Sequence, residues 1–235
     1  KDSAVFFFFA LQVIAAFQQG GYFMTPKQKY YKVAAETILK NIERRGYEGC
    51  YCETSEEAVK KALSYVTPGS SVSFGGSMTM NECGLMDALQ KKDDITLLDR
   101  SKACSQEEIK KIYHKALSCD YYFMSTNAIT LDGQLVNTDG TGNRVAALIY
   151  GPENVIIIAG MNKVAATLEE AESRVKNIAS PPNAIRLDRN TPCALTGSCH
   201  DCFAEGCICS HTVITRRSAI KGRIKLILVG EELGY

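Results

Sequence analysis

The stretch 124-MSTNAITLDGQLVNTDGTGNR-144 decides the fold of this chain. Within it, residues 128–131 and 134–137 each alternate between apolar and polar side chains, as strands with one buried face do. Asp132-Gly133 separates the two segments, and this dipeptide strongly favours the tight turn of a β-hairpin. The stretch therefore predicts two antiparallel strands joined by a short turn.

Polar residues follow the hairpin at close spacing. Asp139, Asn143 and Arg144 fall within six residues and are separated by glycines. Glycine lets a ligand approach the backbone, and the three polar side chains supply fixed donors and acceptors. The same residues also suit a capped turn before a short helix at residues 144–150, because such turn chemistry is common. Both interpretations stay open at this point.

The rest of the chain alternates between helical and strand patterns. Apolar residues at three- and four-residue spacing predict helices over residues 27–45, 54–66, 79–90, 105–117, 144–150 and 165–178. Alternating or continuous β-branched runs predict strands over residues 47–52, 71–74, 95–99, 121–125, 155–159 and 223–229. Pro181-Pro182 is expected to end the last of these helices. The alternation predicts an α/β domain around a mainly parallel sheet, with the hairpin as an insertion.

Size and charge limit the possible classes of protein. The 235 residues suffice for one domain, and 27 basic residues against 26 acidic ones imply neither nucleic acid nor an anionic membrane as a partner. The apolar run at residues 4–17 is shorter than the roughly 20 residues of a membrane span and lacks the basic flank of a signal peptide. We expect residues 1–23 to be an extension outside the fold, with a membrane-facing leader as the alternative. Residues 24–235 are then a single domain, which we expect in the cytoplasm.

A glycine-rich loop follows the second predicted strand. Gly75, Gly76 and Ser77 lie between this strand and the helix predicted from Thr79, an arrangement that presents backbone N–H groups and a positive dipole end to an anion. We therefore expect the three residues to contact a phosphate or carboxylate. Glu82 has two interpretations. It completes the spacing of a capping box with Thr79, which we favour, or it is a weak candidate for a catalytic acid.

A second loop of this kind follows the continuous apolar strand at residues 155–159. Ligands of open parallel sheets bind beyond the carboxyl ends of the strands, and Lys163 falls there. We expect Lys163 to join the anion site, although an exposed lysine beside a turn is the commoner arrangement.

Half of the ten cysteines fall in one segment, residues 192–211. They are Cys193, Cys199, Cys202, Cys207 and Cys209. Thiolates this dense suit a metal site, so zinc or an iron–sulfur cluster is the expected cofactor. Their spacing matches neither a zinc ribbon nor the bacterial ferredoxin pattern. Disulfides and redox-active thiols are the alternatives.

Several motifs occur together in an order that resembles the LUD-domain family. They are the glycine loop at residues 75–85, the hairpin stretch at 127–144, Gly151-Pro152 with residues 155–163, and the cysteine segment that leads to 228-LVGEELGY-235. The resemblance covers about residues 24–235, and residues 1–23 depart from it. It is to the lactate utilisation protein C-like proteins, and among them to short bacterial members with a cysteine-rich tail.

The resemblance implies the fold shared by ribose-5-phosphate isomerase, glucosamine-6-phosphate deaminase and coenzyme A transferases. Ligands in that fold bind at the glycine loop and the strand-end loops. The resemblance therefore assigns ligand contacts to Gly75, Gly76, Ser77, Asn127, Asp139, Gly140, Asn143 and Arg144. Glu82 corresponds in place to a catalytic acid of coenzyme A transferases, but its flanking motif differs.

The resemblance also implies a role in oxidising lactate or related organic acids, alongside partners that carry ferredoxin-type iron–sulfur clusters. We expect the chain to bind a small anionic metabolite, with Arg144 pairing bidentately with its carboxylate or phosphate. An enzymatic role, as an oxidoreductase component, stays open. One alternative is a non-catalytic assembly or regulatory subunit of an iron–sulfur lactate oxidation complex. Another is a transferase or isomerase acting on a phosphorylated or coenzyme A substrate.

Overall fold

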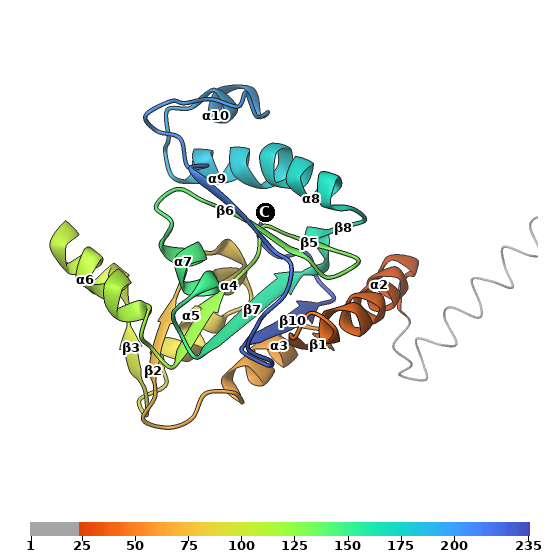
Figure 1. Cartoon of the computed structure of the whole chain (residues 1–235), viewed down its shortest axis with the longest axis horizontal. Helices are drawn as coiled ribbons and strands as arrows, with labels where there is room; N and C mark the ends of the chain where they lie inside the picture. The colour runs from red at the N-terminus through yellow and green to blue at the C-terminus, as the bar shows by residue number, and fades with distance from the viewer. Residues whose placement is uncertain (1–23) are drawn as a thin grey trace, which may run out of the picture.

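A six-stranded parallel sheet forms the centre of the structure, in the order β1-β10-β7-β4-β2-β3 (Figure 1). The computed structural model describes residues 24–235, so the expectations for residues 1–23 lie outside the described part of the chain. The strands of this sheet are β1 Glu48–Cys52, β2 Ser71–Phe74, β3 Thr96–Leu98, β4 Tyr121–Met124, β7 Asn154–Gly160 and β10 Ile224–Val229. The prediction of an α/β domain around a parallel sheet is confirmed.

Helices cover both faces of this sheet. The helices on it are α2 Pro26–Glu43, α3 Ser55–Leu63, α4 Met78–Glu82, α5 Leu85–Gln90, α6 Gln106–Ala116 and α7 Asn143–Ile149. Farther along the chain, α8 Leu168–Arg174 packs on the small sheet described below, and α9 Ser180–Arg186 and α10 Pro192–Thr196 follow it. Side chains of the central strand β7 alternate between two buried clusters. Val155 and Ile157 pack with α2 and α7, whereas Ile156 and Ile158 pack with α3 and α5 on the opposite face. The continuous apolar run of β7 is therefore buried on both sides, as its composition predicts.

The predicted hairpin belongs to a second, smaller sheet in the order β8-β5-β6-β9. Its strands are β5 Ala128–Thr130, β6 Leu135–Asp139, β8 Val164–Ala165 and β9 His211–Thr215. β5 and β6 pair antiparallel around the Asp132-Gly133 turn, and Gly133 has a φ of 89°. The hairpin prediction is confirmed. β9, which no local pattern singled out, pairs antiparallel with β6 and brings the chain back from the cysteine-rich segment.

The helix predicted at residues 79–90 is two short helices. Gly84 has a φ of 81° and separates α4 from α5. The capping box predicted for Thr79 and Glu82 is wrong, because α4 begins one residue earlier, after Ser77. Thr79 therefore lies inside the helix, where its hydroxyl is directed to other partners.

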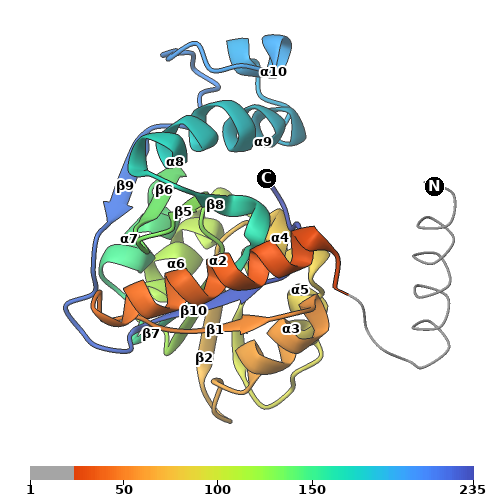
Figure 2. The same cartoon turned by 90° about the vertical axis from the view of Figure 1, so that its right-hand side faces the viewer.

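The helix predicted at residues 165–178 does not end at the two prolines. A π-helical segment, Val175–Ala179, connects α8 directly to α9, and both prolines lie in the first turn of α9. The wider π turn leaves room for residues that donate no backbone hydrogen bond. Figure 2 shows α8 and α9 as one continuous layer above the large sheet, and this layer forms the roof of the site described below.

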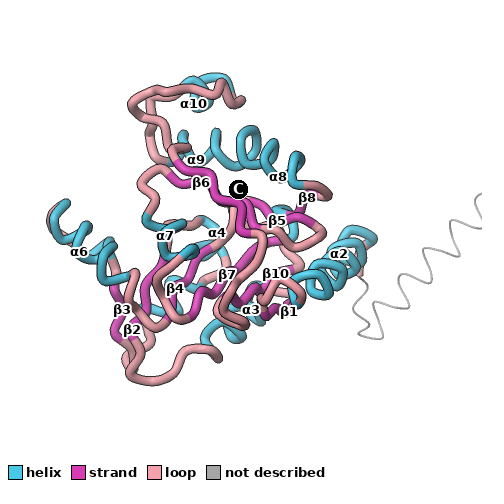
Figure 3. Tube along the Cα trace, in the orientation of Figure 1, coloured by secondary structure: helices cyan, strands magenta, loops and turns pink. Residues whose placement is uncertain are grey.

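The segment after α10 is mainly loop until β9 begins (Figure 3). It contains four of the five clustered cysteines and lies beyond α9 from the large sheet (Figure 1). Among the helices of residues 24–235, none combines the length and apolar character that crossing a membrane requires.

The hairpin turn gives a test of packing against α2. A Cβ at Gly133 would lie 2.7 Å from Cγ2 of Ile42, which is 1% exposed, whereas Gly69 has a similar φ of 82° and nothing within 4 Å. Both Gly133→Ala and Gly69→Ala force a left-handed alanine, at a cost of about 1–2 kcal/mol. We expect Gly133→Ala to lower the free energy of unfolding by about 1–3 kcal/mol more than Gly69→Ala does, because its methyl group overpacks the core. Urea denaturation measures both variants, and equal losses would contradict this account.

Candidate functional site

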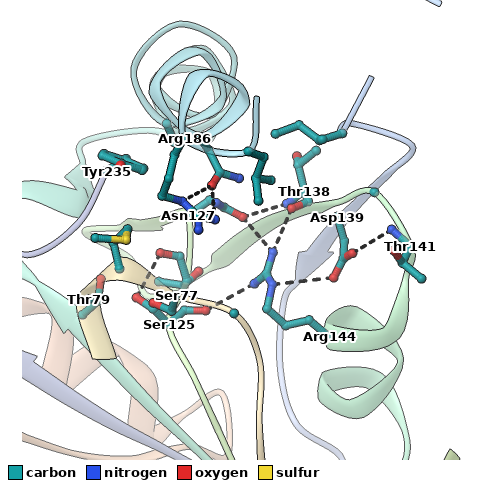
Figure 4. A pocket seen from close by; sticks show the side chains of 18 of the residues that line it. Ser77, Thr79, Ser125, Asn127, Thr138, Asp139, Thr141, Arg144, Arg186 and Tyr235 are labelled. Carbon is teal, nitrogen blue, oxygen red and sulfur yellow. Dashed lines mark hydrogen bonds and ion pairs between the residues drawn. The ribbon is translucent and has the colours of Figure 1, made fainter. Parts of the chain in front are cut away.

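One pocket of about 300 Å³ lies between the carboxyl ends of the central strands and the α9 layer (Figure 4). Its floor comes from the segments that follow β2, β4 and β7, and one wall comes from the exit of β6. Eight of the nine predicted ligand-binding residues line it: Gly76, Ser77, Asn127, Asp139, Gly140, Asn143, Arg144 and Lys163. The rule that ligands bind at the carboxyl ends of parallel strands thus brings the separate motifs to one place.

The ninth predicted residue, Gly75, lies directly behind the pocket wall. A Cβ at this position would be 2.9 Å from Cδ of Arg144. At the neighbouring Gly76, a Cβ would overlap Nη2 of Arg100. The two glycines therefore make room for two arginine side chains, one on each side of the loop. This is a packing role, and backbone contact with an anion stays a prediction.

Arg144 occupies the centre of the wall, and its side chain is 12% exposed. Its Nη1 donates to Ser125 O at 3.2 Å and to Asn137 Oδ1 at 2.5 Å. Its Nη2 donates to Asn127 Oδ1 at 3.0 Å and to Thr138 O at 2.8 Å. These hydrogen bonds use both terminal nitrogens.

The remaining nitrogen of Arg144, Nε, lies 3.6 Å from Asp139 Oδ2. Figure 4 shows the guanidinium enclosed by these groups. The predicted bidentate contact of Arg144 with a ligand is therefore corrected, because protein acceptors already engage both of its terminal nitrogens. Burial lowers the pKa of Arg144, while Asp139 and Tyr122 oppose that shift.

Asp139 closes the turn after β6. Its Oδ1 accepts hydrogen bonds from the backbone N–H groups of Thr141, at 3.1 Å, and Gly142, at 2.9 Å. Oδ2 is buried and, within the described residues, accepts no hydrogen bond, although Arg144 lies near it. The turn is therefore capped, as one interpretation predicts, and it also forms a wall of the pocket, while contact with a ligand stays a prediction.

Lys163 forms part of the floor and is 4% exposed. Its Nζ lies 2.7 Å from Thr79 Oγ1 and 3.1 Å from Ser125 Oγ. No carboxylate of residues 24–235 forms an ion pair with it. The commoner arrangement, an exposed lysine beside a turn, is not what the structure contains.

Three arginines at the pocket were not predicted. Arg100 follows β3, Arg186 ends α9, and Arg189 lies just beyond it. Arg100 was open to the strand-end rule, because β3 runs parallel to β2 and ends at the same edge. Arg186 and Arg189 carry no local signal, since only the long-range packing of α9 brings them over the sheet.

Glu82 lies outside the pocket lining and is exposed. Its Oε2 accepts a hydrogen bond from the backbone N–H of Gly234 at 2.6 Å. This contact anchors the segment that follows β10. A catalytic role for Glu82 has no support from its position.

None of the five clustered cysteines lines the pocket, although Ile208, between Cys207 and Cys209, does. All five are free thiols. Burial raises the pKa of Cys209, and the neighbouring thiols of Cys207, Cys193 and Cys199 add to the shift. In residues 24–235, however, no group of three or more His, Cys, Asp or Glu side chains is arranged to hold a metal ion. The thiols fit zinc or iron–sulfur chemistry in type, but their present arrangement does not form such a site.

A family model described as the LUD domain matches residues 35–229, and no curated protein matches. A solved DUF162 family protein from Deinococcus radiodurans is similar at 10% identity and a TM-score of 0.48, over 85% of this chain and 97% of that one. The solved eIF2B beta from Chaetomium thermophilum is similar at 17% identity and a TM-score of 0.34, over 56% of this chain and 46% of that one. Ribose 5-phosphate isomerase from Plasmodium falciparum is similar at 19% identity and a TM-score of 0.32, over 48% of this chain and 52% of that one.

The hydrogen bonds of Arg144 predict a structural role that stability measurements can test. Arg144→Met leaves buried acceptors unpaired, so we expect the free energy of unfolding to fall by about 3 kcal/mol. Arg186→Met removes the same group from an exposed position whose only side-chain partner is Asn183, and we expect a change within about 0.5 kcal/mol. Chemical denaturation compares the two variants. Similar losses would show that Arg144 is not part of the framework.

Proposed function

This chain belongs to the LUD domain family, as its motifs predict, and we propose that it binds a small anionic metabolite in the pocket beneath α9. The ligand carries a carboxylate or a phosphate. The proposed context is the use of lactate or a related organic acid, which the family resemblance implies.

The observation that supports this proposal is the charge of the pocket. Five cationic side chains line it: Arg100, Arg144, Lys163, Arg186 and Arg189. Among the described lining residues, Asp139 has the one acidic side chain, and it faces Arg144. Four cations are left over, and a partly enclosed pocket concentrates their field on a ligand.

Arg100 and Arg189 are the best-placed groups for an anion. Within residues 24–235, the side chain of neither donates a hydrogen bond to a protein acceptor, unlike that of Arg144. Arg100 lies with its Cζ 5.6 Å from the ring centroid of Tyr113, which orients the guanidinium without using its N–H groups. Arg100 and Arg189, rather than Arg144, therefore have the free donors for a bidentate contact with the anion.

The size and polarity of the pocket suit a small metabolite. Its volume of about 300 Å³ is at the lower end of the range for ligand sites. The hydroxyls of Ser77 and Thr141 and the amide of Asn183 also line it. These groups complement a ligand that carries hydroxyl or carbonyl oxygens beside its charged group.

Anion binding is tested with two double variants of equal charge. Arg100→Gln with Arg189→Gln removes the free donors of the pocket, whereas Arg216→Gln with Arg217→Gln removes two exposed charges outside it. Thermal unfolding is followed against inorganic phosphate, lactate and pyruvate. We expect at least one of these anions to stabilise the native chain, and affinity to fall about tenfold or more only in the pocket variant.

Equal losses in the two double variants would show that net charge alone attracts the anion. Absence of stabilisation of the native chain by all three anions would refute the proposed function.

We propose separately that the cysteine segment binds zinc or an iron–sulfur cluster after its loop rearranges, and that it engages ferredoxin-type partners. The thiols of Cys193, Cys199 and Cys207 lie near that of Cys209 and support this idea. Elemental analysis and visible spectra of anaerobically isolated protein are expected to show about one metal site per chain. Cys199→Ser with Cys209→Ser should abolish it, whereas Cys104→Ser, at an exposed thiol outside the segment, should not. A metal-free, colourless native protein would contradict this proposal.

A further inference from the structure

Lys163 is a buried amine that forms no ion pair with a carboxylate of residues 24–235. It lies after β7, between Thr79 of α4 and Ser125 of the segment after β4, and it is 4% exposed at the floor of the pocket. Burying an unpaired ammonium group costs several kcal/mol, so such a group tends to lose its proton. The amine at the base of this site is therefore unlike the surface lysines of the chain.

Burial and two neighbouring arginines lower the pKa of Lys163. Burial lowers its pKa most, and Arg174 from α8 and Arg144 from α7 lower it further. Glu82 of α4 opposes the shift, but the pKa of Lys163 still falls to about 7. At neutral pH a large fraction of Lys163 consequently carries a free lone pair.

The two hydroxyls leave this lone pair usable. The Thr79 hydroxyl donates to Leu233 O at 3.2 Å, so it accepts a hydrogen bond from Nζ of Lys163. As a donor, the Ser125 hydroxyl makes only a long contact, 3.4 Å, with Thr126 O. It is therefore available to exchange a proton with the amine or with an oxygen that comes to it from the pocket.

We propose that Lys163 is a catalytic residue that captures the carbonyl carbon of a small aldehyde or ketone bearing a carboxylate or phosphate, forming an imine. This inference rests on the proposed function, because the cationic pocket must first hold the anionic group. It names the substrate class more closely: the ligand has a carbonyl carbon within reach of Nζ.

The chemistry needs no oxidant, metal or second substrate. The lone pair of Nζ forms the C–N bond while the C=O π pair moves to oxygen, and the Ser125 hydroxyl relays a proton from nitrogen to that oxygen. The carbinolamine then loses its hydroxyl group and the remaining N–H proton as one water molecule, leaving C=N. Lys163 becomes part of an imine, and hydrolysis restores the free amine.

Trapping with borohydride tests the proposal on the full chain. Glyoxylate, pyruvate and dihydroxyacetone phosphate are the probes, with hydroxyacetone as a matched carbonyl compound that carries no charge. Hydride reduces an imine to a stable secondary amine, and peptide mass mapping locates it. We expect at least one anionic probe to label Lys163 at least about tenfold above every other lysine, and hydroxyacetone not to do so.

The pH profile and three variants make the test specific. Labelling of Lys163 should rise with pH with a midpoint near 7, whereas an ordinary lysine has a pKa of about 10.4. Lys163→Arg keeps the charge and Lys163→Met removes it, and both should lose the label at this position. Ser125→Ala should slow labelling about tenfold or more while leaving anion binding in place.

Binding is measured in parallel by thermal unfolding without borohydride. If the anionic probes stabilise the native protein but none labels Lys163, the imine proposal fails and the proposed function stands. If none of them binds, both fail. Labelling of Lys163 that hydroxyacetone matches would also overturn the assigned substrate class.

Discussion

The guanidinium of Arg144 is the interaction on which the site depends. It joins three segments: the loop after β4, strand β6, and α7, which carries it. A neutral side chain cannot satisfy so many acceptors at once, and lysine lacks the planar geometry. The pocket wall is therefore held by one buried cation rather than by an apolar core.

Two further buried arginines extend this scheme. Arg174 donates to Asn162 O at 3.0 Å and to Asn127 O at 2.6 Å, and so fixes α8 to the loops after β7 and β4. Arg223 donates to Leu148 O, Ala147 O and Pro152 O, and so closes the end of α7. Both donate their hydrogen bonds to backbone carbonyl groups rather than to carboxylates. Their charge stays uncompensated, and that of Arg174, together with Arg144, makes the interior around Lys163 electropositive.

Sequence analysis succeeds where the information is local. Val155–Ala159 predicts a strand buried on both faces, Asp132-Gly133 predicts the hairpin turn, and capping at Ser105 marks the start of α6. It fails where a residue distant in sequence determines the role of a side chain. Thr79 has the spacing of a capping residue, but the Lys163 amine and the Leu233 carbonyl engage its hydroxyl instead. Likewise, Arg186 and Arg189 become site residues only because α8 and α9 fold back over the sheet.

The division of the cations into two groups bears on function. Arg144, Arg174 and Arg223 each have several protein acceptors, and their removal leaves those acceptors unpaired. Within residues 24–235, the side chains of Arg100 and Arg189 donate to no protein acceptor, and Lys163 donates only to the hydroxyls of Thr79 and Ser125. Like charges held close together destabilise a folded chain. Framework needs therefore do not explain the second group. The proposed anion would explain it, because it would supply negative charge at the strand ends, where the pocket opens beneath α9.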